Sequence, residues 1–452
     1  MKRIRHAVIL AGGEGARMAP FHLARPKCLL PVRLEPLLLR MFVQLSELGV
    51  DHFIVVASSK FQDLIQGAVR PWSATVVTAP SNHSQSAAVV GVQAVPPGED
   101  YFLIEGDVWC AKEDLAEVAQ ALDGSVAIAS LVDRLGPERP NDWLVADVQA
   151  GGIRAVWGHP RAGSWRLSGV SAMAGRLDRH FDVDRIGVQG EVGAMPPGQW
   201  EWAEALNHWL GAGNKVAAVE ARQPLVNLDK PWHLYEANRL ALESWMQDRP
   251  SDAEDWRGAG GGWVQAEADA EVSDTAVIRG PVHLGVGSSI GHGAIVEGPV
   301  WVGNDCRIED YAKVSHSVVG HRSRISHTAE MLGGVLFDNV YLMHNCEVYG
   351  ILGENVDIGA GTVFGTLRFD DGPTAHRMGG RWEVPIDGSN AGYLGDFVRT
   401  GVNAVILPGR LVGPYSVVGP GVVVDRDVEP FSQVLVHQEW AIKAWGPSRY
   451  GW

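Results

Sequence analysis

Apolar and polar residues follow two different periods along the chain, and the change falls near residue 250. In the first half, short apolar runs alternate with longer stretches in which apolar residues recur every three to four positions. The runs 7–11, 52–58 and 101–107 are typical of buried strands, whereas 36–50 and 112–122 are typical of amphipathic helices. This alternation predicts an α/β domain with a mixed, mostly parallel sheet and helices on both of its faces.

A six-residue period dominates the second half. Aliphatic residues stand six apart without a break at Val272, Ile278, Leu284, Ile290, Val296, Val302, Ile308 and Val314, and again at Ile406, Val412, Val418 and Val424. This period predicts an all-β parallel β-helix, in which each hexapeptide forms one short face and points one aliphatic side chain inward. A β-sandwich would instead show a period of two with irregular turns. Residues 368–392 interrupt the period and predict a loop or hairpin outside the coils.

The two patterns are separated by a segment of different composition. Residues 246–262 are crowded with Pro, Asp, Glu and Gly, as in a linker. The sequence therefore predicts a first domain over 1–245, a linker over 246–262 and a β-helix domain over 263–452.

Composition narrows the classes of function. A formal net charge of −15 argues against a nucleic-acid partner and against a membrane surface, because both need clustered cations. The four cysteines show no CxxC spacing, and the apolar run at 7–11 is too short for a secretory signal. No apolar run is long enough to cross a bilayer. We expect a cytoplasmic protein with no membrane partner.

A glycine-rich turn, "AGGEGARMAP", follows the first predicted strand, and Pro26-Lys27 comes shortly after it. A Walker A loop is excluded because no lysine follows the glycines, and a dinucleotide fingerprint fits poorly because Met18 takes the third glycine position. The glycines alone also allow a plain tight turn. Bare backbone N–H groups from Gly12 to Ala16 can, however, form a nest for an anion.

The motif "LAGGEGARMAP…RPK" resembles the signature of sugar-1-phosphate nucleotidyltransferases, LxGGxGxRLxP…PK. Further segments similar to that family follow in its order: "LIEGDVW", "RLSGVSAM", "EWAEALNHWLGAGNKVAAVEA" and "LVNLDKPWHLYEAN". The resemblance implies a Rossmann-like nucleotidyltransferase domain. Such a domain transfers a nucleotidyl group from a nucleoside triphosphate to a sugar 1-phosphate and releases pyrophosphate.

The resemblance also implies a set of site residues. Catalytic roles fall to Arg17, which would clamp the triphosphate, and to Lys27, which would neutralise charge on the α-phosphate. Asp107 would hold Mg²⁺ together with either Asp229 or Asn227, a choice that the sequence leaves open. The remaining candidates are, for the nucleotide, Ala11, Gly12, Gly13, Glu14, Gly15, Asn82 and Ser86, and, for the sugar phosphate, His159, Gly169 and Glu204.

Two of these assignments depart from the family pattern. Asn82 and Ser86 resemble the N-x-x-x-S of cytidylyltransferase relatives, so UTP and CTP both stay open as the nucleotide. The family's Glu-Lys-Pro segment reads Gly158-His159-Pro160 here, which makes His159 or Arg161 the substitute for its phosphate-binding lysine.

In the second half, "HNCEVYGILGENVDIGAGTVFGTLRFDD" and "GDFVRTGVNAVILPG" resemble the left-handed β-helix of archaeal-type bifunctional sugar-1-phosphate nucleotidyltransferase/acetyltransferases. The resemblance implies a homotrimer or a dimer of trimers. It also implies acetyl-CoA as an acyl donor, with His344 as general base. Glu347 and Thr366 stand where the family has tyrosine and asparagine, so a pure scaffold role stays open.

Three functional hypotheses follow. The first is a Mg²⁺-dependent sugar-1-phosphate nucleotidyltransferase whose β-helix serves as a trimerisation scaffold. The second adds acetylation of an amino-sugar phosphate by the β-helix. The third is a regulatory subunit that binds nucleotide sugars without turnover, and the presence of Arg17, Lys27 and Asp107 together argues against it, because a pure binder would not require all three.

Overall fold

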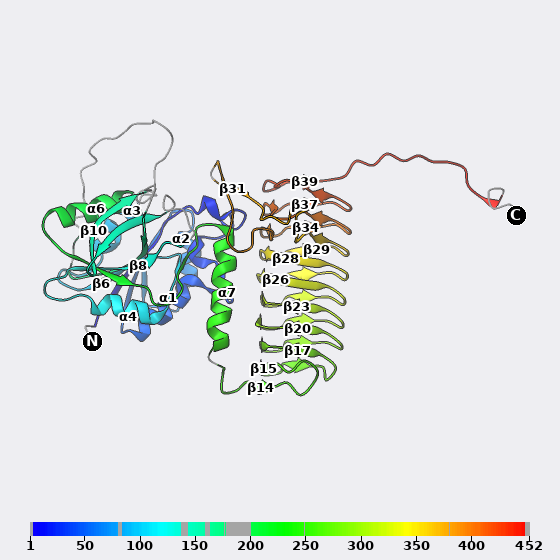
Figure 1. The fold of residues 1–452 in the computed structure, drawn as a ribbon, viewed down its shortest axis with the longest axis horizontal. Helices are drawn as coiled ribbons and strands as arrows, with labels where there is room; N and C mark the ends of the chain where they lie inside the picture. The colour runs from blue at the N-terminus through cyan, green and yellow to red at the C-terminus, as the bar shows by residue number, and fades with distance from the viewer. Residues whose placement is uncertain are drawn as a thin grey trace.

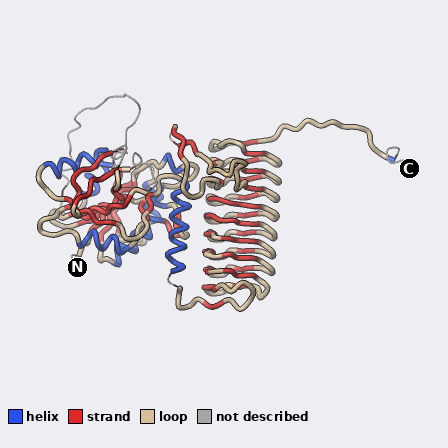
Figure 2. Tube along the Cα trace, in the orientation of Figure 1, coloured by secondary structure: helices blue, strands red, loops and turns tan. Residues whose placement is uncertain are grey.

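The computed structural model describes residues 3–79, 84–136, 143–158, 163–175, 177, 200–247, 249–378 and 380–447. An α/β unit stands beside a column of stacked coils, and one long helix lies between them (Figures 1 and 2). Within the described ranges, no helix has the length and apolar character needed to span a membrane.

A nine-stranded sheet in the order β5-β4-β1-β6-β11-β8-β12-β10-β9 forms the centre of the α/β unit. Of its described strands, β10 and β11 run against the other seven, so the sheet is mixed and mostly parallel, as predicted. The strands are β1 (His6–Ala11), β4 (His52–Ala57), β5 (Ala74–Thr78), β6 (Tyr101–Glu105), β8 (Ile128–Arg134), β9 (Leu144–Gln149), β10 (Gly152–Gly158), β11 (Trp165–Met173) and β12 (Val216–Glu220).

Helices cover both faces of this sheet. Successive side chains of a strand point to opposite faces. Ala7 and Ile9 of β1 therefore join one apolar core, and Val8 joins another. The first core is closed by α1 (Leu37–Glu47), α2 (Gln62–Ala68) and α4 (Lys112–Gln120), and the second by α3 (Ser84–Gln93) and α6 (Trp200–Gly211). The short elements are η1 (Ala16–Met18), η2 (Lys27–Leu29), β2 (Pro31–Val32), β3 (Glu35–Pro36), β7 (Val108–Trp109) and β13 (Val226–Asn227).

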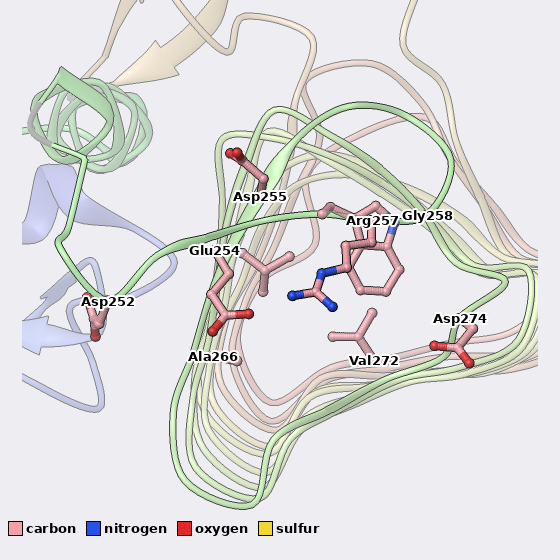
Figure 3. A pocket seen from close by; sticks show the side chains of 10 residues that line it. Asp252, Glu254, Asp255, Arg257, Gly258, Ala266, Val272 and Asp274 are labelled. Carbon is pink, nitrogen blue, oxygen red and sulfur yellow. The ribbon is translucent and has the colours of Figure 1, made fainter.

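The second half is a stack of coils held together by parallel strand pairs. Val282 pairs with Val300 and Ile290 with Ile308, so the partner of a residue stands three hexapeptides further along the chain. Each coil thus contributes three short faces, and the stack is a parallel β-helix. Figure 3, which looks along the column, shows the resulting three-sided outline.

Three ladders run along the column. One consists of β16 (Glu271–Val272), β19 (Ser289–Ile290), β22 (Arg307–Ile308), β25 (Arg324–Ile325), β27 (Tyr341–Leu342), β29 (Asp357–Ile358), β34 (Arg399–Thr400), β37 (Val417–Val418) and β39 (Gln433–Val434). The others consist of β14 (Glu254–Asp255), β15 (Trp263–Ala266), β17 (Val277–Arg279), β18 (Pro281–Leu284), β20 (Ile295–Glu297), β21 (Val300–Val302), β23 (Lys313–Ser315), β24 (Ser317–Val319), β26 (Glu330–Leu336), β28 (Glu347–Leu352), β30 (Val363–Phe364), β33 (Gly392–Leu394), β35 (Val405–Ile406), β36 (Leu411–Val412) and β38 (Val423–Val424).

The interior of the column is lined by the aliphatic residues of the six-residue period. Of the positions singled out from the sequence, Val272 in the first coil is partly buried and the others are buried in one continuous core. The prediction of inward-pointing residues is therefore confirmed. The segment 252–258 lies across the open end of the first coil, where Arg257 extends over Val272 beside a cavity of 630 Å³ lined by several carboxylates (Figure 3).

The interrupted region of the period forms a hairpin outside the coils. It contains β31 (His376–Met378) and β32 (Arg381–Glu383), and Figure 1 shows it reaching from the column toward the α/β unit. After β39 the chain runs away from the column as an extended tail in which Trp440 and Trp445 are exposed (Figure 1).

Helix α7 (Pro231–Gln247) joins the two units, because residues on both of its sides are buried. One apolar cluster contains Leu234 and Trp245 of α7 together with Val318, Val335 and Ile351 of the coils. The rings of Trp263 and Trp301 each lie 5.1 Å from the ring of Trp245. The α/β unit and the column therefore share a core.

Candidate active site

The candidate site lies at the carboxyl ends of β1 and β6, which are neighbours in the sheet. In such sheets, loops beyond the strand ends form the ligand site. Gly106 donates its N–H to the carbonyl of Leu10 at 2.8 Å, which holds the loop after β6 against the end of β1. A Cβ on Gly106 would lie 3.2 Å from the oxygen of Leu10 and 3.3 Å from Cys28, so this close approach favours glycine.

A second strand pair brings a distant segment to the same place. β13 pairs antiparallel with β7, with Asn227 opposite Val108. The N–H of Leu228 donates to the carbonyl of Asp107 at 2.8 Å. The segment 227–229 is therefore fixed beside Asp107 by backbone hydrogen bonds.

One cavity brings together many of the residues predicted from the sequence. Its lining includes Arg17, Lys27, Asp107, Gly169, Asn227 and Asp229. The glycine loop lies at the start of η1, next to this lining: Gly15 has a φ of +68°, and a Cβ on it would lie 3.0 Å from Cγ of Lys27. The loop and the lysine are thus packed against each other.

Two cations and two carboxylates face one another in the cavity. Lys27 Nζ lies 3.3 Å from Asp107 Oδ2 and 3.1 Å from Asp229 Oδ1, and Arg17 Nη2 lies 2.8 Å from the same Asp229 oxygen. Burial alone would lower the pKa of Lys27, but the two carboxylates more than offset this and hold the pKa above its ordinary value. Burial opposes ionisation of Asp229 as well, yet Lys27 and Arg17 keep its pKa below the ordinary range.

Asn227 presents an oxygen with no partner. Its Nδ2 donates to the carbonyl of Ser168 at 2.9 Å, whereas its buried Oδ1 accepts no hydrogen bond from any residue that the structure describes. Its position in the cavity lining with Asp107 makes this amide oxygen a suitable ligand for a hard cation. Among the described residues, no group of three or more His, Cys, Asp or Glu could hold a metal ion. The Asp107 carboxylate and the Asn227 amide oxygen are hard oxygen donors in one cavity lining. Such a pair fits Mg²⁺, which takes few protein ligands and completes its shell with water and substrate phosphates.

Several lining residues were not predicted from the sequence. Glu105 ends β6 two positions before Asp107, and burial together with the Asp107 charge raises its pKa to about 8. The predicted Gly169 packs against Glu105: it has a φ of +79°, and a Cβ on it would lie 2.5 Å from Glu105 Oε2. Trp143 and Trp202 add aromatic surface to the wall of the cavity. The only sequence signal for Glu105 was its place beside the Gly-Asp pair.

The structure places the other predicted residues elsewhere. Ala11 ends β1 and is buried, and Gly12, Gly13 and Glu14 form the following loop, in which Gly13 and Glu14 are exposed. Glu204 is exposed on α6 and is not among the cavity-lining residues. His344 lies in the coils, stacked on His327 at 5.1 Å between ring centroids. Asn82 and His159 lie outside the described residues, and of Ser86 only the backbone position in α3 is described.

This fold and site define a class of protein. The chain matches the family described as "MobA-like NTP transferase domain" over residues 7–220, and the family described as "GlmU-like, C-terminal hexapeptide" over residues 286–378. The first unit is thus a MobA-like NTP transferase domain, and the coils carry a GlmU-like hexapeptide region.

Particular relatives cover nearly the whole chain. A "Bifunctional sugar-1-phosphate nucleotidylyltransferase/acetyltransferase" from Sulfurisphaera tokodaii is 24% identical over 93% of this chain and 98% of its own. A "Bifunctional protein GlmU" from Methanocaldococcus jannaschii is 21% identical over 96% of this chain and 98% of its own. The solved inositol-1-phosphate CTP transferase from T. maritima aligns with a TM-score of 0.44 at 17% identity, covering 53% of this chain and 95% of that one. The chain is homologous to the two bifunctional proteins over most of its length.

Proposed function

We propose that the protein is a Mg²⁺-dependent sugar-1-phosphate nucleotidyltransferase. One observation carries the proposal: Arg17 and Lys27 face Asp107, Asp229 and Asn227 in a single cavity beside the glycine loop. Cations beside a loop of bare backbone suit a polyphosphate, and a carboxylate with an amide oxygen suits its metal ion.

The chemistry asked of these residues is positioning and charge stabilisation. The backbone of the glycine loop and Arg17 bind the triphosphate. An oxygen of the sugar phosphate attacks the α-phosphorus, and the bond from that phosphorus to the bridging oxygen of the pyrophosphate breaks. Lys27 neutralises the charge that builds on the α-phosphate oxygens. It is already charged and held in the cavity by its two carboxylates, so little reorganisation precedes the reaction.

Asp107 and Asn227 would hold the Mg²⁺ ion, which supplies charge neutralisation to the phosphates when it is bound. Asn227 is favoured over Asp229 because its Oδ1 has no hydrogen-bond partner among the described residues, whereas the Asp229 carboxylate contacts both cations. Asp229 then serves mainly to orient Arg17 and Lys27.

The finer assignments come from the resemblance of individual segments. UTP or CTP is proposed as the nucleotide, from Asn82 and Ser86, and His159, Gly169 and Glu204 as contacts of the sugar phosphate. Of these, the position of Gly169 in the cavity lining supports its assignment. We further propose that the coils are left-handed and assemble as a homotrimer or a dimer of trimers in the cytoplasm.

The decisive experiment measures pyrophosphate release. The full chain is incubated with Mg²⁺, each of ATP, CTP, GTP, UTP and dTTP, and a panel of sugar 1-phosphates. Release with UTP or CTP and at least one sugar phosphate is expected. No pyrophosphate release with any combination of nucleotide and sugar 1-phosphate would reject catalysis. Binding of a nucleotide sugar without turnover would then support the regulatory alternative.

Acyl transfer by the coils is a second candidate. It is favoured by the partly exposed His344, which lies within the GlmU-like region and is stacked on His327 of the preceding coil. A neutral histidine can accept the proton of an amine that attacks a thioester. Acetyl-CoA and amino-sugar phosphates should then release free thiol. An His344→Ala protein as active as its parent would remove this histidine from the reaction.

A further inference from the structure

An ion pair links the hairpin of the coils to the segment that carries Asn227 and Asp229. Glu383 of β32 contacts Lys230, the residue after Asp229, and the two side chains are only 7% and 5% exposed. Trp232, at the start of α7, lies 5.3 Å from the ring of His376 in β31. The hairpin therefore lies directly against the strand end that enters the active site.

A second, partly buried contact reaches the loop that carries Lys27. Arg25 forms ion pairs with Asp396 and, at 2.9 Å, with Glu354, which belong to neighbouring coils. The Asp396 side chain is 2% exposed, and its Oδ1 also accepts the N–H of Glu354 at 2.9 Å. The guanidinium of Arg25 lies 5.2 Å from the ring of Phe337, another residue of the coils.

These contacts with the coils fix the two chain segments that carry Lys27 and Asp229. Lys27 comes two residues after Arg25, and Asp229 comes immediately before Lys230. The side chains of Lys27 and Asp229 lie 3.1 Å apart. Removing a carboxylate from such an ion pair takes away part of the charge that offsets the desolvation of its cation, so the cation shifts toward its other neighbours or toward water. A displacement of about 1 Å in a catalytic constellation costs up to about 100-fold in rate.

We propose that Glu383 and Asp396, two residues of the β-helix, are positioning residues for the nucleotidyl-transfer site. This inference rests on the proposed function. The coils then complete the geometry of the first unit's active site, in addition to any scaffold or acyl-transfer role. The hairpin that interrupts the six-residue period has a function in the other half of the chain.

Full-length Glu383→Gln and Asp396→Asn proteins test the idea by steady-state kinetics. The turnover number is expected to fall about tenfold while KM for both substrates stays within about twofold, because orientation rather than binding is lost. Glu383→Asp, which keeps the charge, should recover part of the turnover. The matched control is Asp387→Asn. It removes a half-exposed ion pair between the region 368–392, which contains the hairpin, and Arg239 of α7. Unchanged turnover in both test variants would overturn the proposal.

Hydrogen exchange supplies a readout that needs no activity. Amides of 226–234 should exchange about tenfold faster in Glu383→Gln, and those of 20–30 in Asp396→Asn, with the parent rate in Asp387→Asn. Exchange at the parent rate in both test variants would reject the positioning role. If the parent releases no pyrophosphate, the proposed function fails while exchange still decides whether the coils hold these segments. If the Glu383→Gln protein does not fold, the Glu383→Asp and Asp396→Asn proteins are compared with the parent instead.

Discussion

A single lysine separates two carboxylates at the centre of the candidate site. Without Lys27, Asp107 and Asp229 would lose the cation that lies between them, Arg17 would remain in contact with Asp229, and the α-phosphate would lose its cation. Both effects act on the transition state, where charge develops.

The Lys27→Ala protein should therefore lose on the order of 100-fold in turnover. Pyrophosphate release measures the loss, and circular dichroism verifies the fold. Lys112→Ala is the matched control, since Lys112 forms an exposed ion pair with Glu47 at 2.7 Å, away from the cavity lining. Equal losses in the two variants would mean that Lys27 acts through stability alone.

Asn227 offers a test of the metal assignment. Replacing Asn227 by Ala removes the buried amide oxygen that no described residue hydrogen-bonds, so Mn²⁺, used as a probe for Mg²⁺, should bind about tenfold more weakly. Electron paramagnetic resonance of free Mn²⁺ gives the affinity directly. Asn214→Ala changes an exposed asparagine and should bind Mn²⁺ like the parent. Parent-like binding by Asn227→Ala would move the ligand role to Asp229.

The sequence predicted the charged members of the site better than its walls. Arg17 and Lys27 belong to one spaced motif and Asp107 to a separate segment of the same family resemblance, so the resemblance implied that the three would lie together. Trp202 and Glu204 show the opposite case, because two positions along a helix turn the side chain by about 200°. The motif located the right helix, but Trp202 lines the cavity and Glu204 is exposed.

At the scale of single elements, the coils depend on one inward aliphatic per hexapeptide. Ile325 of β25 is fully buried in the column. Ile325→Ala should lower the free energy of unfolding by about 2–5 kcal/mol, because it removes apolar contacts and leaves a cavity. Urea unfolding measures the change. Val402→Ala, at a position 51% exposed, should change it by less than about 0.5 kcal/mol.

A similar cost at both positions would mean that the column repacks around the lost side chain.

The six-residue period allowed this core to be predicted from the sequence, because a repeat is visible in the local sequence alone. The contacts of α7 with β24, β26 and β28 leave no such signal. They join residues about a hundred positions apart, and no periodic pattern in either segment indicates that the two are in contact. The ion pair between Lys230 and Glu383 could not be predicted from the sequence for the same reason.

At the scale of the whole molecule, buried and partly buried histidines link stability to pH. Burial is the largest cause that lowers the pKa of His6, His22, His233, His283 and His376. A histidine with a lowered pKa is neutral in the folded state but takes up a proton when unfolded. Stability is therefore complete above the ordinary pKa of about 6.5 and falls as the pH drops below it.

The midpoint of thermal unfolding should accordingly decrease between about pH 7.5 and pH 5.5. His283 contributes through burial against Trp301, with Glu267 raising its pKa and Arg33 lowering it. His283→Gln should flatten the decrease, which calorimetry at several pH values detects. A slope identical to that of the parent would assign the effect to the other histidines.

The three indole rings of Trp245, Trp263 and Trp301 bridge the junction between the two units. Aromatic rings packed edge to face in a fixed arrangement give near-ultraviolet circular dichroism bands that vanish when their packing is lost. The near-ultraviolet circular dichroism of these tryptophans should therefore report whether the α/β unit and the column are in contact. Following that band during denaturation, next to the far-ultraviolet signal of the strands, would reveal whether the halves separate before either one melts.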